Sequence, residues 1–131
     1  MNENSVVDAN EVSGQIVNAA MTVHSVLGPG LLESAYEGCL IHELKKRRLA
    51  VASQVILPVI YDGVKIDVGY RVDVKVAERV IVEIKAVERL LPIHQAQLLT
   101  YLKLADCKLG LILNFNVLHM KDGITRMVNG L

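Results

Sequence analysis

Hydrophobic residues in the first third of the chain recur at the spacing of two amphipathic helices. Between residues 9 and 27 they return every three or four positions, which is the period of one helix face. The residues of this stripe are Val12, Ile16, Ala19, Ala20, Val23, Val26 and Leu27. Gly28-Pro29-Gly30 predicts the end of the first helix. A second helix is predicted over residues 31–49, with an apolar stripe of Leu32, Ala35, Tyr36, Cys39, Leu40 and Leu44.

The middle of the chain changes to the two-residue alternation of β-strands. Residues 51–61 and 64–76 are predicted strands joined by an Asp62-Gly63 turn. Pro58 lies inside the first of them, which favours an edge position because proline cannot donate to a ladder. A second hairpin is predicted over residues 72–86, with Ala77-Glu78-Arg79 as its loop.

The last third returns to a helix and then to two short strands. The helix is predicted over residues 90–106, and the strands over residues 108–115 and 124–128. The predicted order is therefore α-α-β-β-β-β-α-β-β. Such an order is typical of an α/β fold in which helices flank a mixed central sheet. With 131 residues, we expect a single domain over residues 1–131.

The second hairpin has an apolar face and a charged face. The apolar face is predicted to hold Val72, Val74, Val76, Val80, Val82, Ile84 and Ala86, and the other face Arg71, Asp73, Lys75, Glu83 and Lys85 along with Ile81. With the loop centred on Glu78, Asp73 lies directly opposite Glu83, and Arg71 opposite Lys85. Like charges facing each other in this way cost roughly a few tenths to 1 kcal/mol a pair.

Two interpretations of this arrangement stay open from the hairpin alone. A divalent cation would relieve the repulsion between Asp73 and Glu83, since Mg²⁺ is commonly held by one or two carboxylates. Lys85 beside it would help to activate water for attack on a phosphodiester. Alternatively, the face is solvated and its charges carry no function. In the metal-free protein, relief of the repulsion predicts that alanine at Asp73 or Glu83 raises stability.

Composition narrows the class of protein. The hydrophobic fraction of 52% is enough for a core, and 14 basic residues balance 14 acidic ones. A neutral chain has no general attraction to nucleic acid, so binding would need a local patch. Cys39 and Cys107 are expected to be buried free thiols. The sequence shows no signal peptide and no membrane span, and we expect a cytoplasmic location.

Three motifs of the chain resemble those of a known family. Asp73 followed by Glu83-Ile84-Lys85 resembles the D…(E/D)-x-K core of the PD-(D/E)XK nuclease superfamily. Gly30-Leu31-Leu32-Glu33-Ser34-Ala35-Tyr36 is similar to the signature of its small bacterial GxxExxY family. Gln97-Leu98-Leu99-Thr100-Tyr101 resembles the QxxxY helix of its RecB-like and λ-exonuclease-like branch. The segments GYRVD, VIVEIKAVE and GLILNF extend the resemblance over residues 28–128.

The resemblance implies a restriction-endonuclease-like sandwich and a role for each motif residue. Asp73, Glu83 and the backbone carbonyl of Ile84 would hold Mg²⁺, with Mn²⁺ as the alternative ion. Lys85 would orient the attacking water. The remaining members are Glu33, which would bind metal through water or hold a second ion, and Gln97 and Tyr101, which would line the cleft and contact phosphate. The superfamily has a proline before its aspartate, where this chain has Val72.

Several of these residues also have simpler explanations. Gln97 and Tyr101 share a helix face that His94 extends, and solvent alone could account for such a polar stripe. Glu33 could merely complement the dipole of its helix, as could the basic run Lys45-Lys46-Arg47-Arg48 at the opposite end, although a phosphate-facing role for that run stays open. Tyr61 and Tyr70 are predicted to pack against the sheet, and His24 and His42 to lie at a helix surface or boundary.

Two functions follow from these features. The first is a metal-dependent nuclease that hydrolyses phosphodiester bonds of nucleic acid, with DNA as the expected substrate. The second is a nuclease-fold module that binds a protein or nucleic acid with little or no turnover, which the neutral charge and small size keep open. Small nucleases of this kind often pair to cover two strands, so the resemblance is also compatible with a homodimer.

Overall fold

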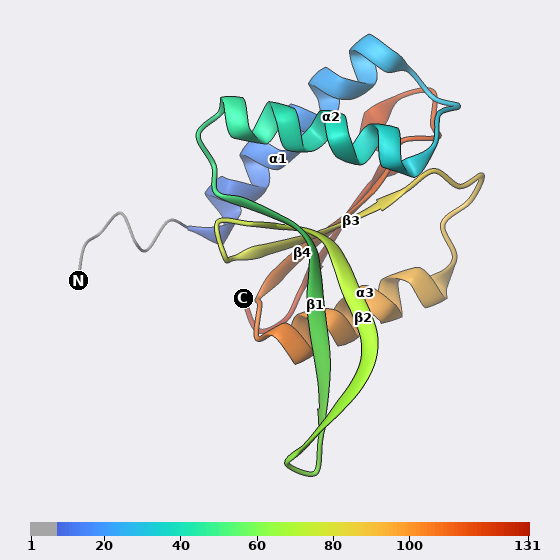
Figure 1. The fold of residues 1–131 in the computed structure, drawn as a ribbon. Helices are drawn as coiled ribbons and strands as arrows, with labels where there is room; N and C mark the ends of the chain where they lie inside the picture. Colours follow the sequence, from blue (N-terminus) through green and yellow to red (C-terminus); the bar gives the residue numbers. More distant parts are fainter. Residues whose placement is uncertain (1–7) are drawn as a thin grey trace.

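Helices cover both faces of a five-stranded mixed sheet (Figure 1). The computed structural model describes residues 8–131. In chain order, the elements are α1 (Ala9–Leu27), α2 (Glu33–Lys46), β1 (Val51–Tyr61), β2 (Val64–Val76), β3 (Val80–Lys85), α3 (Pro92–Ala105), β4 (Leu109–Asn114), a short 3-10 helix (Met120–Gly123) and β5 (Ile124–Val128). The α/β class and the mixed sheet agree with the prediction from sequence.

The helix boundaries follow from local capping. The Asp8 side chain accepts a bond of 2.9 Å from the Asn10 amide at the start of α1. Gly28 ends this helix with φ 69°, a backbone conformation that glycine adopts without strain. Helix α1 thus has the predicted bounds, whereas α2 is shorter than predicted at both ends. Between α2 and α3 the predicted order has four strands, whereas the structure has three, and β2 spans Val64–Val76 as its predicted range does.

The strands lie in the sheet in sequence order, β1-β2-β3-β4-β5. Strands β3 and β4 are parallel, and the other neighbouring pairs are antiparallel. A parallel pair needs a crossover connection, which α3 provides. Strand β1 is an edge strand, as Pro58 predicted, and its register with β2 shifts between Leu57 and Val59.

Two cores lie on opposite faces of the sheet. On one face, α1 and α2 bury the valines of β2 and β3 against β4, and the Tyr36 and Phe115 rings stack with centroids 4.5 Å apart. On the other face, Leu98 and Leu102 of α3 pack on Ile81 and Ile112. Val72 belongs to this second core, although alternation had placed it with Val74. The regular alternation of β2 is therefore interrupted at Asp73.

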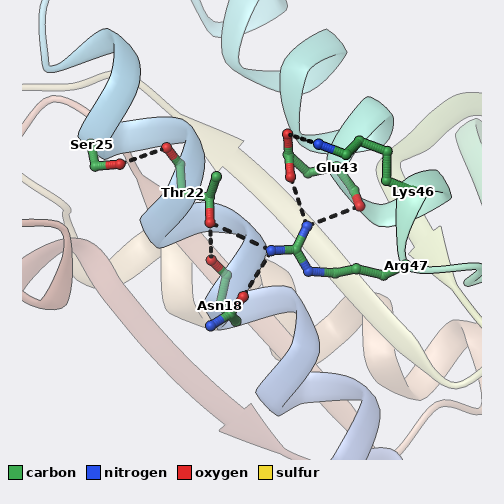
Figure 2. A network of polar contacts seen from close by, with 6 residues as sticks. All are labelled: Asn18, Thr22, Ser25, Glu43, Lys46 and Arg47. Carbon is green, nitrogen blue, oxygen red and sulfur yellow. Dashed lines mark hydrogen bonds and ion pairs between the residues drawn. The ribbon is translucent and has the colours of Figure 1, made fainter.

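A polar network joins α1 to α2 (Figure 2). The Arg47 guanidinium donates to Glu43 Oε1 at 2.8 Å and, across the helix pair, to Asn18 Oδ1 at 2.8 Å. Lys46 also pairs with Glu43, at 3.5 Å. Arg47 and Lys46 therefore have structural partners, which accounts for half of the basic run without a phosphate ligand.

The environments of several other residues differ from those predicted. Cys39 is exposed, whereas Cys107 is buried as predicted. Tyr61 and Tyr70 do not pack within the sheet, since Tyr61 is 74% exposed and Tyr70 is 46% exposed. They belong to the part of the β1–β2 hairpin that runs past α3 and away from α1 and α2 (Figure 1). Among residues 8–131, no helix is long and apolar enough to cross a membrane.

Gly123 is the position where the fold leaves least room. A methyl group there would collide with the carbonyl oxygen of Asn114. We predict that Gly123→Ala lowers the free energy of unfolding by about 2–4 kcal/mol, measured by urea denaturation. Gly38→Ala is the matched control because nothing lies within 4 Å of its new methyl group. It should raise stability by about 0.5–1 kcal/mol through helix propensity. Equal effects of the two changes would contradict the packing described.

Candidate active site

The ladder between β2 and β3 ends just before Asp73. Main-chain pairing covers only Val76↔Val80, Lys75↔Ile81 and Val74↔Val82, in the predicted register. Beyond it, carboxylates replace main-chain acceptors. The Asp73 amide donates to Glu83 Oε2 at 2.9 Å, and the Ile84 amide donates to Asp73 Oδ2 at 2.8 Å. The two carboxylates are close, as predicted, but each is bound to the other residue's strand.

This geometry corrects two expectations from the hairpin. Asp73 and Glu83 are not a ladder pair, and Arg71 pairs with Ile56 of β1, with no ladder partner at Lys85. The expectation that alanine at Asp73 stabilises the protein changes as well. That substitution would remove the acceptor of the Ile84 amide, and an unsatisfied buried amide costs about 1–3 kcal/mol.

Glu83 is the most perturbed acid of the site. Only 7% of the residue is exposed. Burial raises the pKa of its carboxyl to about 7, with further upward contributions from the negative charges of Asp73 and Glu37. The bond from the Asp73 amide and the positive charge of Lys85 act in the opposite direction. The Glu83 carboxyl therefore titrates near neutral pH, and a positive charge close by would favour its ionised form.

The end of β3 positions Ile84 and Lys85 beside this pair. Within a strand, the N–H and C=O of one residue point to the same edge. Since the Ile84 amide bonds to Asp73, the Ile84 carbonyl also faces β2, at a point where the ladder has ended. The Lys85 carbonyl faces β4 instead and accepts from the Phe115 amide at 3.0 Å. This arrangement leaves the Ile84 carbonyl as a third oxygen next to the carboxylates.

Helix α2 adds a carboxylate that the sequence analysis missed. Glu37 accepts bonds of 3.1 Å at both carboxylate oxygens from Gln54 of β1. Burial raises the pKa of Glu37, and the charges of Asp73 and Glu33 raise it further. Glu33 is exposed in the first turn of the same helix. Glu37 is therefore close enough to feel the negative charge of Asp73, and it is less exposed than Glu33. The signal was present in the sequence, because Glu37 is four residues after Glu33 and shares its helix face.

Helix α3 contributes Tyr101 and Gln97 from the opposite direction. Tyr101 is 7% exposed, and burial raises its pKa, with added effects from the charges of Glu83, Tyr70 and Asp73. Its ring centroid lies 6.1 Å from that of Tyr70. Gln97 is exposed and lines a cleft of about 470 Å³ with Tyr101 and Tyr70. His94 caps the helix, since its Nδ1 accepts from the Leu91 amide at 3.1 Å.

Asn114 of β4 is a second residue that sequence analysis missed. It is buried, and its side chain bonds both main-chain groups of Val87, accepting from the amide at 3.1 Å and donating to the carbonyl at 3.0 Å. These bonds fix the chain just after Lys85. An asparagine at the end of the apolar run GLILN was the available signal, because a buried amide needs polar partners.

The oxygen atoms present fit a divalent cation. Each carboxylate uses one oxygen for its amide bond, which leaves Asp73 Oδ1 and Glu83 Oε1 for a ligand, together with the Ile84 carbonyl. No three acidic, histidine or cysteine side chains among residues 8–131 are grouped closely enough to hold a metal by themselves. Two carboxylates, a carbonyl and several waters are a ligand set typical of Mg²⁺.

Comparison with known proteins agrees with this geometry. Residues 10–127 match the model of a family described as PD-(D/E)XK nuclease superfamily. The chain belongs to the PD-(D/E)XK nuclease superfamily. Its mixed sheet with helices on both faces is consistent with the restriction-endonuclease-like fold, and PD-(D/E)XK nucleases typically use divalent metal ions. Searches of curated proteins and of solved structures found no match.

The raised pKa of Glu83 predicts how the stability of this PD-(D/E)XK protein depends on pH. The usual carboxyl pKa of 4.5 applies to the unfolded chain, and the folded value is about 7. The contribution of the protonated Glu83 carboxyl to the free energy of unfolding is therefore fully present below about pH 4.5. It is lost as pH rises through about 7, by about 3 kcal/mol in total. Urea denaturation in EDTA across this range measures it.

Glu83→Gln should remove this part of the pH dependence, because the amide oxygen can still accept from Asp73 without carrying a charge. Glu88→Gln, at an exposed carboxylate, is the control and should leave the slope unchanged. An unchanged slope in Glu83→Gln would mean that Glu83 is not the titrating group.

Proposed function

We propose that the protein is a Mg²⁺-dependent nuclease that hydrolyses phosphodiester bonds of nucleic acid, with DNA as the substrate. The observation that carries this proposal is the pair Asp73 and Glu83 at the end of the β2–β3 ladder. Each is bound to the other's strand and retains a second oxygen. The superfamily membership supports nuclease chemistry and a nucleic-acid substrate.

The roles of the residues follow from where they lie. Asp73, Glu83 and the Ile84 carbonyl would hold the metal, with Mn²⁺ as an alternative ion. When bound, the metal would supply charge stabilisation at the phosphate and lower the pKa of a bound water. Lys85 would orient the attacking water by donating to it. Glu33 would act through water from the first turn of α2, and Glu37, whose pKa is raised by burial and by the charge of Asp73, is the better placed of the two acids.

Tyr101 and Gln97 would contact the substrate from α3. The hydroxyl of Tyr101 is protonated at neutral pH, as in any ordinary tyrosine, and burial and nearby negative charge raise its pKa further. It can therefore donate to a phosphate oxygen, and Gln97 can do the same through its amide. We also propose that the protein is a cytoplasmic bacterial member of the GxxExxY family, related to the RecB-like branch. The motif residues Gly30, Glu33, Tyr36, Gln97 and Tyr101 support this assignment.

Cleavage of nucleic acid tests the proposal directly. Labelled single-stranded, duplex and branched DNA and RNA would be incubated with the protein in Mg²⁺ or Mn²⁺. We expect cleavage that EDTA abolishes. Lys85→Met should lower the rate at least about 100-fold, because it removes the donor to the attacking water.

Lys75→Met is the matched control for Lys85→Met. Lys75 lies on the same hairpin, and its ammonium pairs with Glu78 at 3.3 Å at the opposite end of the ladder. The Lys75→Met variant should retain the wild-type cleavage rate. If metal binds at Asp73 and Glu83 but no substrate is cut, the binding module without turnover becomes the better account.

A further inference from the structure

A β-ribbon arm extends from the body of the protein. We define the arm as residues 56–71, the distal part of the β1–β2 hairpin. Beyond Leu57 and Tyr70, the two strands continue as a ribbon in which Val59 pairs with Ile66 and Tyr61 with Val64. All residues from 60 to 71 are exposed. Figure 1 shows the hairpin running past α3, away from α1 and α2.

The arm exposes more apolar surface than is usual for a monomeric protein. Seven large apolar residues on it are between 40% and 74% exposed, namely Ile56, Ile60, Tyr61, Val64, Ile66, Val68 and Tyr70. At roughly 150–250 Å² for an aromatic side chain and less for valine or isoleucine, the seven residues together expose on the order of 800 Å² over both sides of the ribbon. The largest apolar patch on a typical monomer is about 300–600 Å². One side of a stable protein interface is about 800 Å², so the uncharged side of the arm would form the apolar centre of such an interface, and neighbouring surface such as α3 would supply the rest.

The two sides of the arm differ in charge. Residues paired across the ribbon share a side, and neighbours along a strand alternate. Val59, Tyr61, Val64 and Ile66 therefore share one side, which carries no ionised group. Tyr70 lies on this side as well, since it lines the same cleft as Val59. On the other side, Ile60 pairs with Lys65 and Ile56 with Arg71.

The uncharged side continues onto α3. Val59 and Tyr70 of the arm line the 470 Å³ cleft together with Ile93, Ala96 and Leu104 of the helix. Ile93 is 66% exposed. The arm and the outer face of α3 thus form one continuous apolar surface, with the arm on one side of the cleft and the helix on the other.

The charge and backbone of the arm favour a second copy of this chain as the occupant. The arm has two basic and two acidic residues, Lys65, Arg71, Asp62 and Asp67, so it offers no net positive charge to a phosphate backbone. In a two-fold dimer the same surface packs against itself, and an uncharged apolar surface does so without any need to match charges across the axis. Pro58 has no amide hydrogen and lies at a register shift in β1, which opposes edge-to-edge strand pairing and leaves face-to-face packing.

We propose that the uncharged side of the arm, with Ile93 of α3, is a homodimer surface on which two copies pack face to face about a two-fold axis. The second copy would lie beside the cleft that Gln97 and Tyr101 line. The two candidate active sites would then be held in a fixed relation. The proposal goes beyond the nuclease function and does not depend on it, because association needs neither metal nor cleavage.

Sedimentation equilibrium of the full chain tests the proposal. Between about 1 and 100 µM, a range that spans moderate and weak dimers, we expect a mass of twice the 14.4 kDa of one chain. The double variant Tyr61→Thr, Ile66→Thr should weaken the dimer at least about tenfold, because it removes the central apolar contacts of the packed face. Threonine keeps the β-propensity of the ribbon.

The double variant Ile56→Thr, Ile60→Thr is the matched control. It removes a similar exposed apolar area from the charged side of the same hairpin, and it should remain a dimer. Far-ultraviolet circular dichroism would verify that both variants are folded. A monomeric wild-type chain at 100 µM would overturn the proposal. So would equal weakening by both variants, or no weakening by the first. Loss of nucleic-acid binding in the first variant of a monomeric chain would assign the arm to substrate instead.

Discussion

The separation of β2 from β3 at Asp73 is the constraint on which the site depends. Where the ladder stops, two main-chain amides would lose their acceptors inside the protein. The carboxylates of Asp73 and Glu83 take over as acceptors, each for the opposite strand. The same two bonds therefore hold the strands together and bring two negative charges into a largely buried place. Packing against α3 on one side and α2 on the other keeps the arrangement in position.

The charges around Asp73 and Glu83 determine what the site can bind. Burial and the neighbouring charges of Asp73 and Glu37 work against ionisation of Glu83, and Lys85 compensates only in part. A proton can neutralise the pair, and so can a divalent cation, for which the Ile84 carbonyl offers a third oxygen. Neutral acceptors could hold the two strands together without repulsion, so a bound cation explains why the protein keeps two acids at this point.

Sequence reasoning recovered much of this arrangement. The hairpin register was predicted because a two-residue period and a short loop leave few alternatives, and proximity of Asp73 to Glu83 followed from it. The exchange of carboxylates for main-chain acceptors was not predictable, since alternation assumes a regular ladder. For the same reason, Val72 was assigned to the wrong face. Glu37 was missed because no motif includes it, although helical spacing from Glu33 would have found it. Tyr61 and Tyr70 are exposed because the hairpin extends beyond the rest of the domain. The two-residue period of a strand does not indicate how far a hairpin extends.

The measurement that tests the central claim most directly is the effect of Mn²⁺ on the backbone amide resonances of the protein. A paramagnetic ion broadens the signals of nearby amides, so it locates the cation without any need for turnover. If the account is right, broadening will be strongest at the amides of Asp73, Ile84 and Lys85. Excess Mg²⁺ will reverse it, and Glu83→Gln will greatly weaken it. Broadening centred elsewhere, or none at these three amides, would contradict the claim that the carboxylates at the end of the β2–β3 ladder form a metal site.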